Sequence, residues 1–292
     1  MEKEIAKAAT LVEAFPYIRS FRDKIVVVKY GGSTQPEEGG SVTVMADLVF
    51  METVGMRPVV VHGGGKEISR QLEASGIESK WLHGLRVTDK ETMQVVEDTL
   101  FGVINRRIVD GIEMLDGMAR GMSAKDAGVM HVRQHLVDVE ENGVQVDIGY
   151  VGDVERIDPE PIRRACEEGV IPVVAPIGMG PEGESYNVNA DTAAGEIARA
   201  LQAEKLVFLT DVNGICRDPS DPTSRISTLH IHDVNGLVQQ GVASGGMIPK
   251  LDACVRAVRG GVHKTHIVDG GVPHALLLEI FTREGIGTEI VQ

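Results

Sequence analysis

The chain has 292 residues, of which 42% are hydrophobic and 25% are charged, so it can bury a large core and is typical of globular proteins. Its formal net charge of -14 argues against nucleic acid and anionic membrane as general partners, because both favour a basic surface. Three widely spaced cysteines indicate neither a disulfide framework nor a zinc site, and no apolar signal segment opens the chain. We expect a cytoplasmic protein with no metal held by its own side chains.

Residues 1 to about 20 predict an amphipathic helix that precedes the first core strand. Its apolar positions recur at helical spacing up to Pro16. Such a helix either packs on its own chain or pairs between subunits, and the sequence leaves both possibilities open.

The stretch 24–32 predicts a buried strand that ends in Lys29 and Tyr30 and opens into Gly31 and Gly32. Glycines let backbone N–H groups approach an anion closely, and a lysine adds positive charge beside them. The order is not that of a Walker loop, in which the lysine follows the glycines. The turn is suited to phosphate, although Lys29 could also be a lysine that simply ends a strand.

A second buried strand is predicted at 57–62, where it opens into three glycines, 63–65, and a helix over 66–74. With the helix expected at 44–54, this makes two strand-glycine-helix units in succession. Such units form parallel neighbours with right-handed crossovers, and ligands bind at the carboxyl ends of their strands. The sequence therefore predicts an α/β fold with a mostly parallel sheet.

Arg86 follows a glycine and precedes Thr88 and Asp89, either of which can cap a long helix running toward Ile108. An arginine in such a loop is either solvated or a bidentate clamp for a carboxylate.

Residues 129–158 alternate around Asn142-Gly143, which predicts a β-hairpin. A helix over 159–168 and a buried strand over 170–175 follow, and this strand is expected to end the first lobe.

The second half places polar groups just before an alanine-rich helix that runs to about residue 203. Asn187, Asn189 and Asp191 stand at alternate positions there, which is more than a helix cap requires. Strands are expected at 206–210, 263–268 and 288–291. Pro249 suits a first helical turn, which places Lys250 at a helix N-terminus.

Six stretches in the right order together resemble the amino acid kinase family: 29–32, 60–65, 84–88, 186–191, 209–214 and 245–250. The resemblance covers nearly the whole chain and is closest to the branch that phosphorylates N-acetyl-L-glutamate in arginine biosynthesis. It implies an open three-layer αβα sandwich with a mostly parallel central sheet. It also implies an N-acetylglutamate lobe over 21–180 and an ATP lobe over 181–292.

By that resemblance the γ-phosphoryl group of MgATP passes to the side-chain carboxylate, with Mg²⁺ held mainly by the ATP phosphates. The catalytic residues would be Lys29, Lys250 and Asp191. Substrate would be bound by Gly64, Gly65, Arg86, Asn187 and Asn189, phosphate by Gly31 and Gly32, and nucleotide by Thr210, Asp211, Gly214, Ile215, Gly245 and Gly246.

The two ends of the chain resemble the arginine-inhibited members, in which an N-terminal helix interlaces dimers into a hexamer. An arginine site would then comprise Tyr17, Lys205, Glu279, Gly285 and Gly287. Departures from the usual motif stand at 33–35, Lys66, Ala124 and Ala127, and they leave fine substrate choice open. The alternatives are a kinase for glutamate, aspartate or carrier-bound aminoadipate, and a catalytically silent arginine sensor.

Overall fold

The computed structural model describes residues 1–31, 42–138, 145–218, 220–282 and 285–292. The predicted phosphate residue Gly32, the motif departures at 33–35 and the predicted hairpin turn at 142–143 lie outside these ranges.

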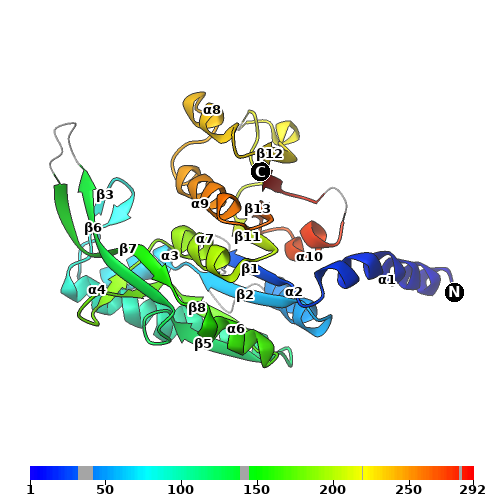
Figure 1. Ribbon diagram of the computed structural model, residues 1–292, viewed down its shortest axis with the longest axis horizontal. Helices are drawn as coiled ribbons and strands as arrows, with labels where there is room; N and C mark the ends of the chain where they lie inside the picture. Colours follow the sequence, from blue (N-terminus) through cyan, green and yellow to red (C-terminus); the bar gives the residue numbers. More distant parts are fainter. Residues whose placement is uncertain (32–41, 139–144, 219, 283–284) are drawn as a thin grey trace.

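The core of the fold is an eight-stranded sheet with the order β12-β14-β13-β11-β1-β2-β8-β5 (Figure 1). Its strands are β12 (Thr228–His230), β14 (Thr288–Val291), β13 (Lys264–Asp269), β11 (Lys205–Thr210), β1 (Ile25–Tyr30), β2 (Arg57–His62), β8 (Ile171–Ala175) and β5 (Ala119–Ser123). Every neighbouring pair is parallel except β13 and β14. The mostly parallel sheet predicted from the glycine-ended strands is confirmed.

Both faces of this sheet are covered by helices, because its strands are apolar on both sides. Val26 and Val28 belong to one hydrophobic cluster, and Val27 belongs to the other. The first cluster includes residues of α2 (Val42–Thr53), α3 (Gly65–Ala74), α4 (Lys90–Glu97), the π-helix η1 (Asp98–Asn105), α5 (Arg106–Glu113) and α10 (Ala275–Ile280). The second includes residues of α6 (Glu160–Glu167), α7 (Ala190–Leu201), α8 (Val234–Gln239) and α9 (Met247–Arg259). The predicted αβα sandwich is therefore confirmed.

The predicted hairpin is also present and extends from the body at the left of Figure 1. It consists of β6 (Met130–Asp138) and β7 (Gln145–Ile157), which pair antiparallel. Two short strands, β9 (Ile177–Met179) and β10 (Ser185–Asn187), close it into a small barrel. A second, two-residue hairpin is formed by β3 (Trp81–Leu82) and β4 (Leu85–Arg86), and a 3-10 turn, η2, spans Pro222–Ser224.

The N-terminal helix α1 (Glu2–Phe21) continues through Pro16 and projects away from the sandwich (Figure 1). Ile5, Leu11, Val12 and Phe15 are 61–73% exposed, so these side chains do not pack on their own chain. The helix is anchored near its C-terminal end, where the rings of Tyr17 and Phe281 meet edge to face at 6.4 Å. No helix in the described ranges is both long and apolar enough to cross a membrane.

The long helix expected after Asp89 is regular only in part. Asp89 caps it as predicted, since its carboxylate accepts a hydrogen bond from Thr92 N. The chain then widens into η1 before it resumes as α5. The helical spacing of the apolar residues in this stretch does not distinguish a π-helix from an α-helix. The π-helix places Leu100 and Ile104 against the glycine loop that follows β2.

Candidate active site

Three predicted catalytic residues meet at the carboxyl end of β1. Lys29 Nζ lies 2.7 Å from Asp191 Oδ1, and Lys250 Nζ lies 3.0 Å from Asp191 Oδ2. Lys29 comes from β1, Asp191 from the first turn of α7 and Lys250 from the first turn of α9. Segments separated by up to 221 positions therefore converge on one carboxylate.

This cluster is largely shielded from water, since the side chains of Lys29, Asp191 and Lys250 are 9%, 8% and 18% exposed. Burial alone would raise the pKa of Asp191, but the charges and hydrogen bonds of the two lysines hold it below its ordinary value. With Asp191 ionised, two ammonium groups and one carboxylate leave a net charge of +1. The cluster is thus suited to an anion.

A cavity of about 210 Å³ opens beside the cluster. It is lined by Lys29 and Asp191, by the glycine loop 63–65, and by residues of β4 and of the segment before α7. The lining includes the predicted substrate residues Gly64, Gly65, Arg86, Asn187 and Asn189. The sequence prediction that these residues share one site is consistent with this arrangement.

The glycine loop lies so close to the π-helix η1 that position 64 has no room for a side chain. A Cβ at Gly64 would collide with the side chains of Leu100 and Ile104. The first hydrogen bond of α3 runs from Ile68 N to Gly64 O, so the helix does not use the N–H groups of Gly64 and Gly65, whereas the Gly63 N–H donates to the Tyr30 carbonyl at 3.0 Å. Such groups at a helix N-terminus favour an anion.

Arg86 is 5% exposed, so the interpretation of it as a solvated arginine is wrong. Its guanidinium donates to the hydroxyls of Ser69 and Ser79 and to the Gly65 carbonyl, and it lies 4.4 Å from the Trp81 ring centroid. Burial lowers its pKa. The sequence offered no signal for these partners, which hold the guanidinium against the first turn of α3.

The two asparagines before α7 differ in what they do. Asn189 is the N-cap of α7, and its side-chain oxygen accepts from the N–H groups of Asp191 and Thr192 at 2.9 and 3.1 Å. Capping therefore accounts for Asn189, but not for Asp191, which pairs with the two lysines as described above. Asn187 ends β10 and lines the cavity.

The predicted nucleotide residues occupy two loops, after β11 and before α9. Thr210 ends β11 and is buried, and Asp211 is exposed. Gly214 has a φ of +76°, and Ile215 is a core residue whose N–H donates to Thr288 Oγ1. Gly246 is the N-cap of α9 and Gly245 precedes it with a φ of +53°. Their nucleotide-binding role stays a prediction.

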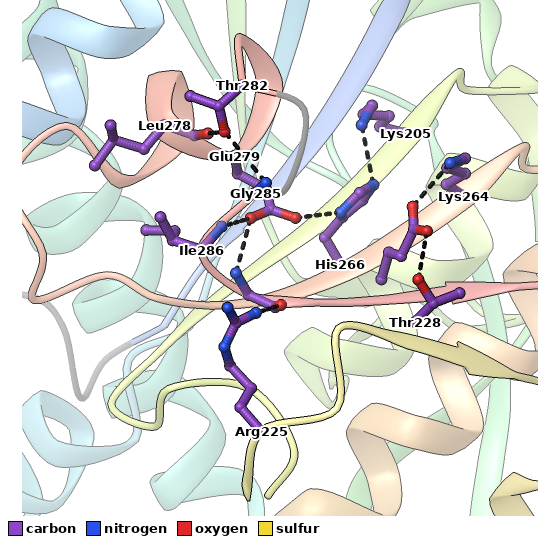
Figure 2. A network of polar contacts seen from close by, with 12 residues as sticks. Lys205, Arg225, Thr228, Lys264, His266, Leu278, Glu279, Thr282, Gly285 and Ile286 are labelled. Carbon is purple, nitrogen blue, oxygen red and sulfur yellow. Dashed lines mark hydrogen bonds and ion pairs between the residues drawn. The ribbon is translucent and has the colours of Figure 1, made fainter. Parts of the chain in front are cut away.

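A second cavity, of about 440 Å³, lies between α1, the strands β11, β13 and β14, and α10. Four residues of the predicted arginine site line it: Tyr17, Lys205, Glu279 and Gly285. The fifth, Gly287, donates its N–H to Glu279 Oε2 at 2.9 Å. Figure 2 shows this network, in which Glu279 lies between the loop residues Gly285 and Ile286 and the ring of His266.

The ring of His266 links the predicted residues Lys205 and Glu279 through polar contacts on both of its nitrogens. Glu279 Oε1 lies 2.6 Å from His266 Nδ1, and His266 Nε2 lies 3.1 Å from Lys205 Nζ (Figure 2). Burial would raise the pKa of Glu279, but the His266 contact and the N–H groups of Ile286 and Gly287 lower it. Burial also lowers the pKa of His266, so this ring is neutral at pH 7. The Glu279 carboxylate thus has a lowered pKa although its side chain is buried.

Four charged or titratable residues of this cavity were not predicted: Arg225, Lys264, His266 and Glu289. Arg225 donates to the Gly287 carbonyl, and Lys264 pairs with Glu289 at 2.8 Å. The only signal in the sequence was that Lys264 and His266 stand at alternate positions of a predicted strand, so that both point to one face of the sheet.

Residues 24–269 match the model of the amino acid kinase family, and the chain belongs to that family. It is 52% identical over 295 residues to the acetylglutamate kinase of Heliobacterium modesticaldum, with 100% of both chains covered. It is also 52% identical over 289 residues to the acetylglutamate kinase of Moorella thermoacetica, with 98% of both covered.

A solved N-acetylglutamate synthase from Neisseria gonorrhoeae, complexed with coenzyme A and N-acetyl-glutamate, superposes with a TM-score of 0.83 at 29% identity. The match covers 98% of this chain and 63% of the synthase, so the chain spans less than two thirds of that protein. Carbamate kinase from Giardia lamblia, with a TM-score of 0.63 at 15% identity over 92% of this chain and 98% of that one, shares the fold.

Proposed function

We propose that this chain transfers the γ-phosphoryl group of ATP to the side-chain carboxylate of N-acetyl-L-glutamate, giving N-acetyl-L-glutamyl 5-phosphate for arginine biosynthesis. The observation that carries the proposal is the Lys29-Asp191-Lys250 cluster beside a cavity that also contains Arg86 and Asn187. The full-length similarity to acetylglutamate kinases supports it. In this assignment residues 21–180 bind the acid and residues 181–292 bind ATP, with Asn187 of the second lobe contributing to the acid site.

The chemistry matches the residue types in the cavity. A carboxylate with a pKa near 4 is already ionised at pH 7, so the reaction needs no general base. The protein must align two anions and stabilise the charge of the transition state. Lys29 and Lys250 would contact the transferred group from opposite sides, and Asp191 would keep both ammonium groups in place.

The remaining residues would orient the two substrates. The N–H groups of Gly64 and Gly65 would donate to the phosphoryl oxygens, Arg86 would bind the α-carboxylate, and Asn187 would bind the acetamide. Within the described ranges no group of three or more His, Cys, Asp and Glu side chains could hold a metal. We propose that the ATP phosphates supply most of the oxygens for Mg²⁺, which would neutralise part of their charge.

Substrate choice is the part of the proposal that most needs a test. Ala124 and Ala127 depart from the usual motif: Ala124 lies in the hydrophobic core, and the partly buried Ala127 packs against it. Lys66 is exposed. Glutamate, aspartate or a carrier-bound aminoadipate remain the alternative acids.

ATP-dependent trapping of the acyl phosphate with hydroxylamine tests the assignment. Product from N-acetylglutamate, with little from glutamate or aspartate, is expected. Product from another acid alone would contradict the substrate and keep the kinase. No product from any acid would contradict the catalytic proposal and favour a silent arginine sensor.

We further propose that arginine binds the second cavity and inhibits the enzyme. The cavity offers groups of both kinds that a zwitterion with a cationic side chain requires, since it is lined by the acidic Glu279 and by the basic Lys205, Arg225 and Lys264. A solved N-acetylglutamate synthase complexed with coenzyme A and L-arginine superposes with a TM-score of 0.79 at 27% identity, over 97% of this chain and 65% of the synthase.

Glu279→Gln is expected to weaken arginine inhibition at least 10-fold and to change kcat by less than about 3-fold, because it neutralises the acidic side of the cavity. Glu168→Gln, at an exposed pair with Arg120, is the matched control. Full activity of the wild-type enzyme at saturating arginine would contradict the regulatory proposal.

A homo-oligomer in the cytoplasm completes the proposed function. The exposed apolar side chains of α1 support pairing between subunits. We propose a dimer core extended to a hexamer, as the resemblance to the arginine-inhibited members implies.

A further inference from the structure

His62 is a buried titratable residue to which the proposed chemistry assigns no role. It is the last residue of β2, is 0% exposed and directly precedes the glycine loop. Its Nδ1 lies 3.2 Å from the Gly63 carbonyl oxygen, and its Nε2 lies 3.1 Å from Asn105 Nδ2. Asn105 Nδ2 also donates to the Val173 carbonyl at 2.8 Å.

These contacts define where the protons are. A carbonyl oxygen only accepts hydrogen bonds, so His62 Nδ1 carries the proton and Nε2 accepts from Asn105. The Val173 carbonyl fixes the amide orientation of Asn105 for the same reason. Burial lowers the pKa of His62 to about 4, with a smaller contribution from the charge of Lys29, so the ring is neutral at pH 7.

The surrounding chain is built to keep Asn105 in this position. Asn105 is the last residue of the π-helix η1, and it is 2% exposed. Its side-chain oxygen faces Gly121 of β5, where a Cβ would collide with it. The same π-helix contributes Leu100 and Ile104, which contact Gly64. One irregular helical segment thus supports both the loop and the residue that precedes it.

A trans peptide points its C=O and its N–H in opposite directions. Anchoring the Gly63 carbonyl to the buried ring of His62 therefore fixes the direction of the Gly64 N–H on the cavity side of the loop. We propose that His62 and Asn105 are positioning residues, which hold the Gly63-Gly64 peptide so that the Gly64 N–H donates to the phosphoryl group during transfer. This inference rests on the proposed kinase function.

Three variants separate positioning from folding. His62→Asn keeps a donor at the place of Nδ1, His62→Leu removes it, and Asn105→Ala removes the partner of Nε2. We expect kcat to fall about 10- to 100-fold in His62→Leu, less in Asn105→Ala and least in His62→Asn, with KM for both substrates within about 3-fold of wild type. Ile108→Val, in the core of α5, is the control for lost packing and should leave kcat unchanged.

An unchanged kcat in folded His62→Leu, or equal losses in His62→Leu and His62→Asn, would overturn the positioning role. Should His62→Leu not fold, ¹⁵N NMR of the His62 ring in the wild-type protein supplies a second readout. A proton on Nδ1 is expected, and a proton on Nε2 alone would overturn the proposal. Wild-type protein that makes no acyl phosphate would overturn the kinase function and this inference together, whereas an active wild type with normal variants overturns only the inference.

Discussion

At Asp191 one carboxylate lies between two ammonium groups that have little water around them. Asp191→Asn should leave both ammonium groups without a counter-charge, which destabilises the fold by about 3 kcal/mol. It should also lower kcat by about 100-fold or more, because the lysines lose their alignment. Thermal unfolding and steady-state kinetics measure the two effects.

Asp252→Asn provides the matched control for that change. Asp252 lies on α9 near Lys250, but its ion pair with Arg256 is more than half exposed and should contribute little. Equal losses in the two variants would mean that the Asp191 cluster has no special role.

His62 should make the stability of the protein depend on pH. The unfolded chain protonates this histidine near pH 6.5 and the folded chain only near pH 4, so the free energy of unfolding falls as the pH drops through that window. Between pH 7 and pH 5 the expected loss from this group is about 2 kcal/mol. Urea unfolding at pH 7 and pH 5 measures this loss. In His62→Asn, the free energy of unfolding should differ between the two pH values by about 2 kcal/mol less than in wild type.

His232 is exposed and serves as the control for that comparison. His232→Asn should keep the pH dependence of wild type. A His62→Asn protein with the wild-type dependence would place the titration elsewhere.

Residues of the active site were more predictable than those of the second cavity. Lys29, Asp191 and Lys250 stand in motifs, so their types and spacing indicate their chemistry. His266 reaches Lys205 only because β11 and β13 pair in register, with Val207 opposite His266. That register joins segments about sixty residues apart, and local periodicity contains no information about it.

Among the elements, η1 and β5 meet at a close contact that can be tested. Gly121→Ala places a methyl group against Asn105 Oδ1 and should destabilise the protein by about 1–3 kcal/mol while lowering kcat. Gly102→Ala, in η1, meets nothing within 4 Å and should be neutral or slightly stabilising. Thermal unfolding of both variants checks this, and a neutral Gly121→Ala would contradict the tight fit.

The elements with strong local signals were predicted to within a few residues. The strands 25–30, 57–62 and 288–291 are apolar runs or follow clear breaks, and the structure confirms them. The strand β5 was missed because Ala119–Ser123 has no β-branched residue, and it is a strand because β8 supplies its partner. Arg86 was placed in a loop because two-residue strands such as β4 leave no period to detect.

For the whole molecule, the exposed apolar side chains of α1 predict assembly. Leu11→Gln should shift the protein toward smaller oligomers, since it places a polar group on a surface that we expect a second subunit to cover. Glu13→Gln, also exposed on α1, should not. Light scattering after size-exclusion chromatography measures the mass, and equal masses for wild type and Leu11→Gln would contradict the assembly.

The position of β1 has a consequence for how the chain folds as it is made. β1 lies between β2 and β11, and its pairing with β11 joins residues 26–30 to residues 205–209. At a synthesis rate of about 5–20 residues per second, one edge of this apolar strand waits roughly 10 to 40 s for its partner. The strand that carries Lys29 is therefore exposed to aggregation on the ribosome until β11 is made, and an N-terminal fragment without β11 should depend on chaperones to stay in solution.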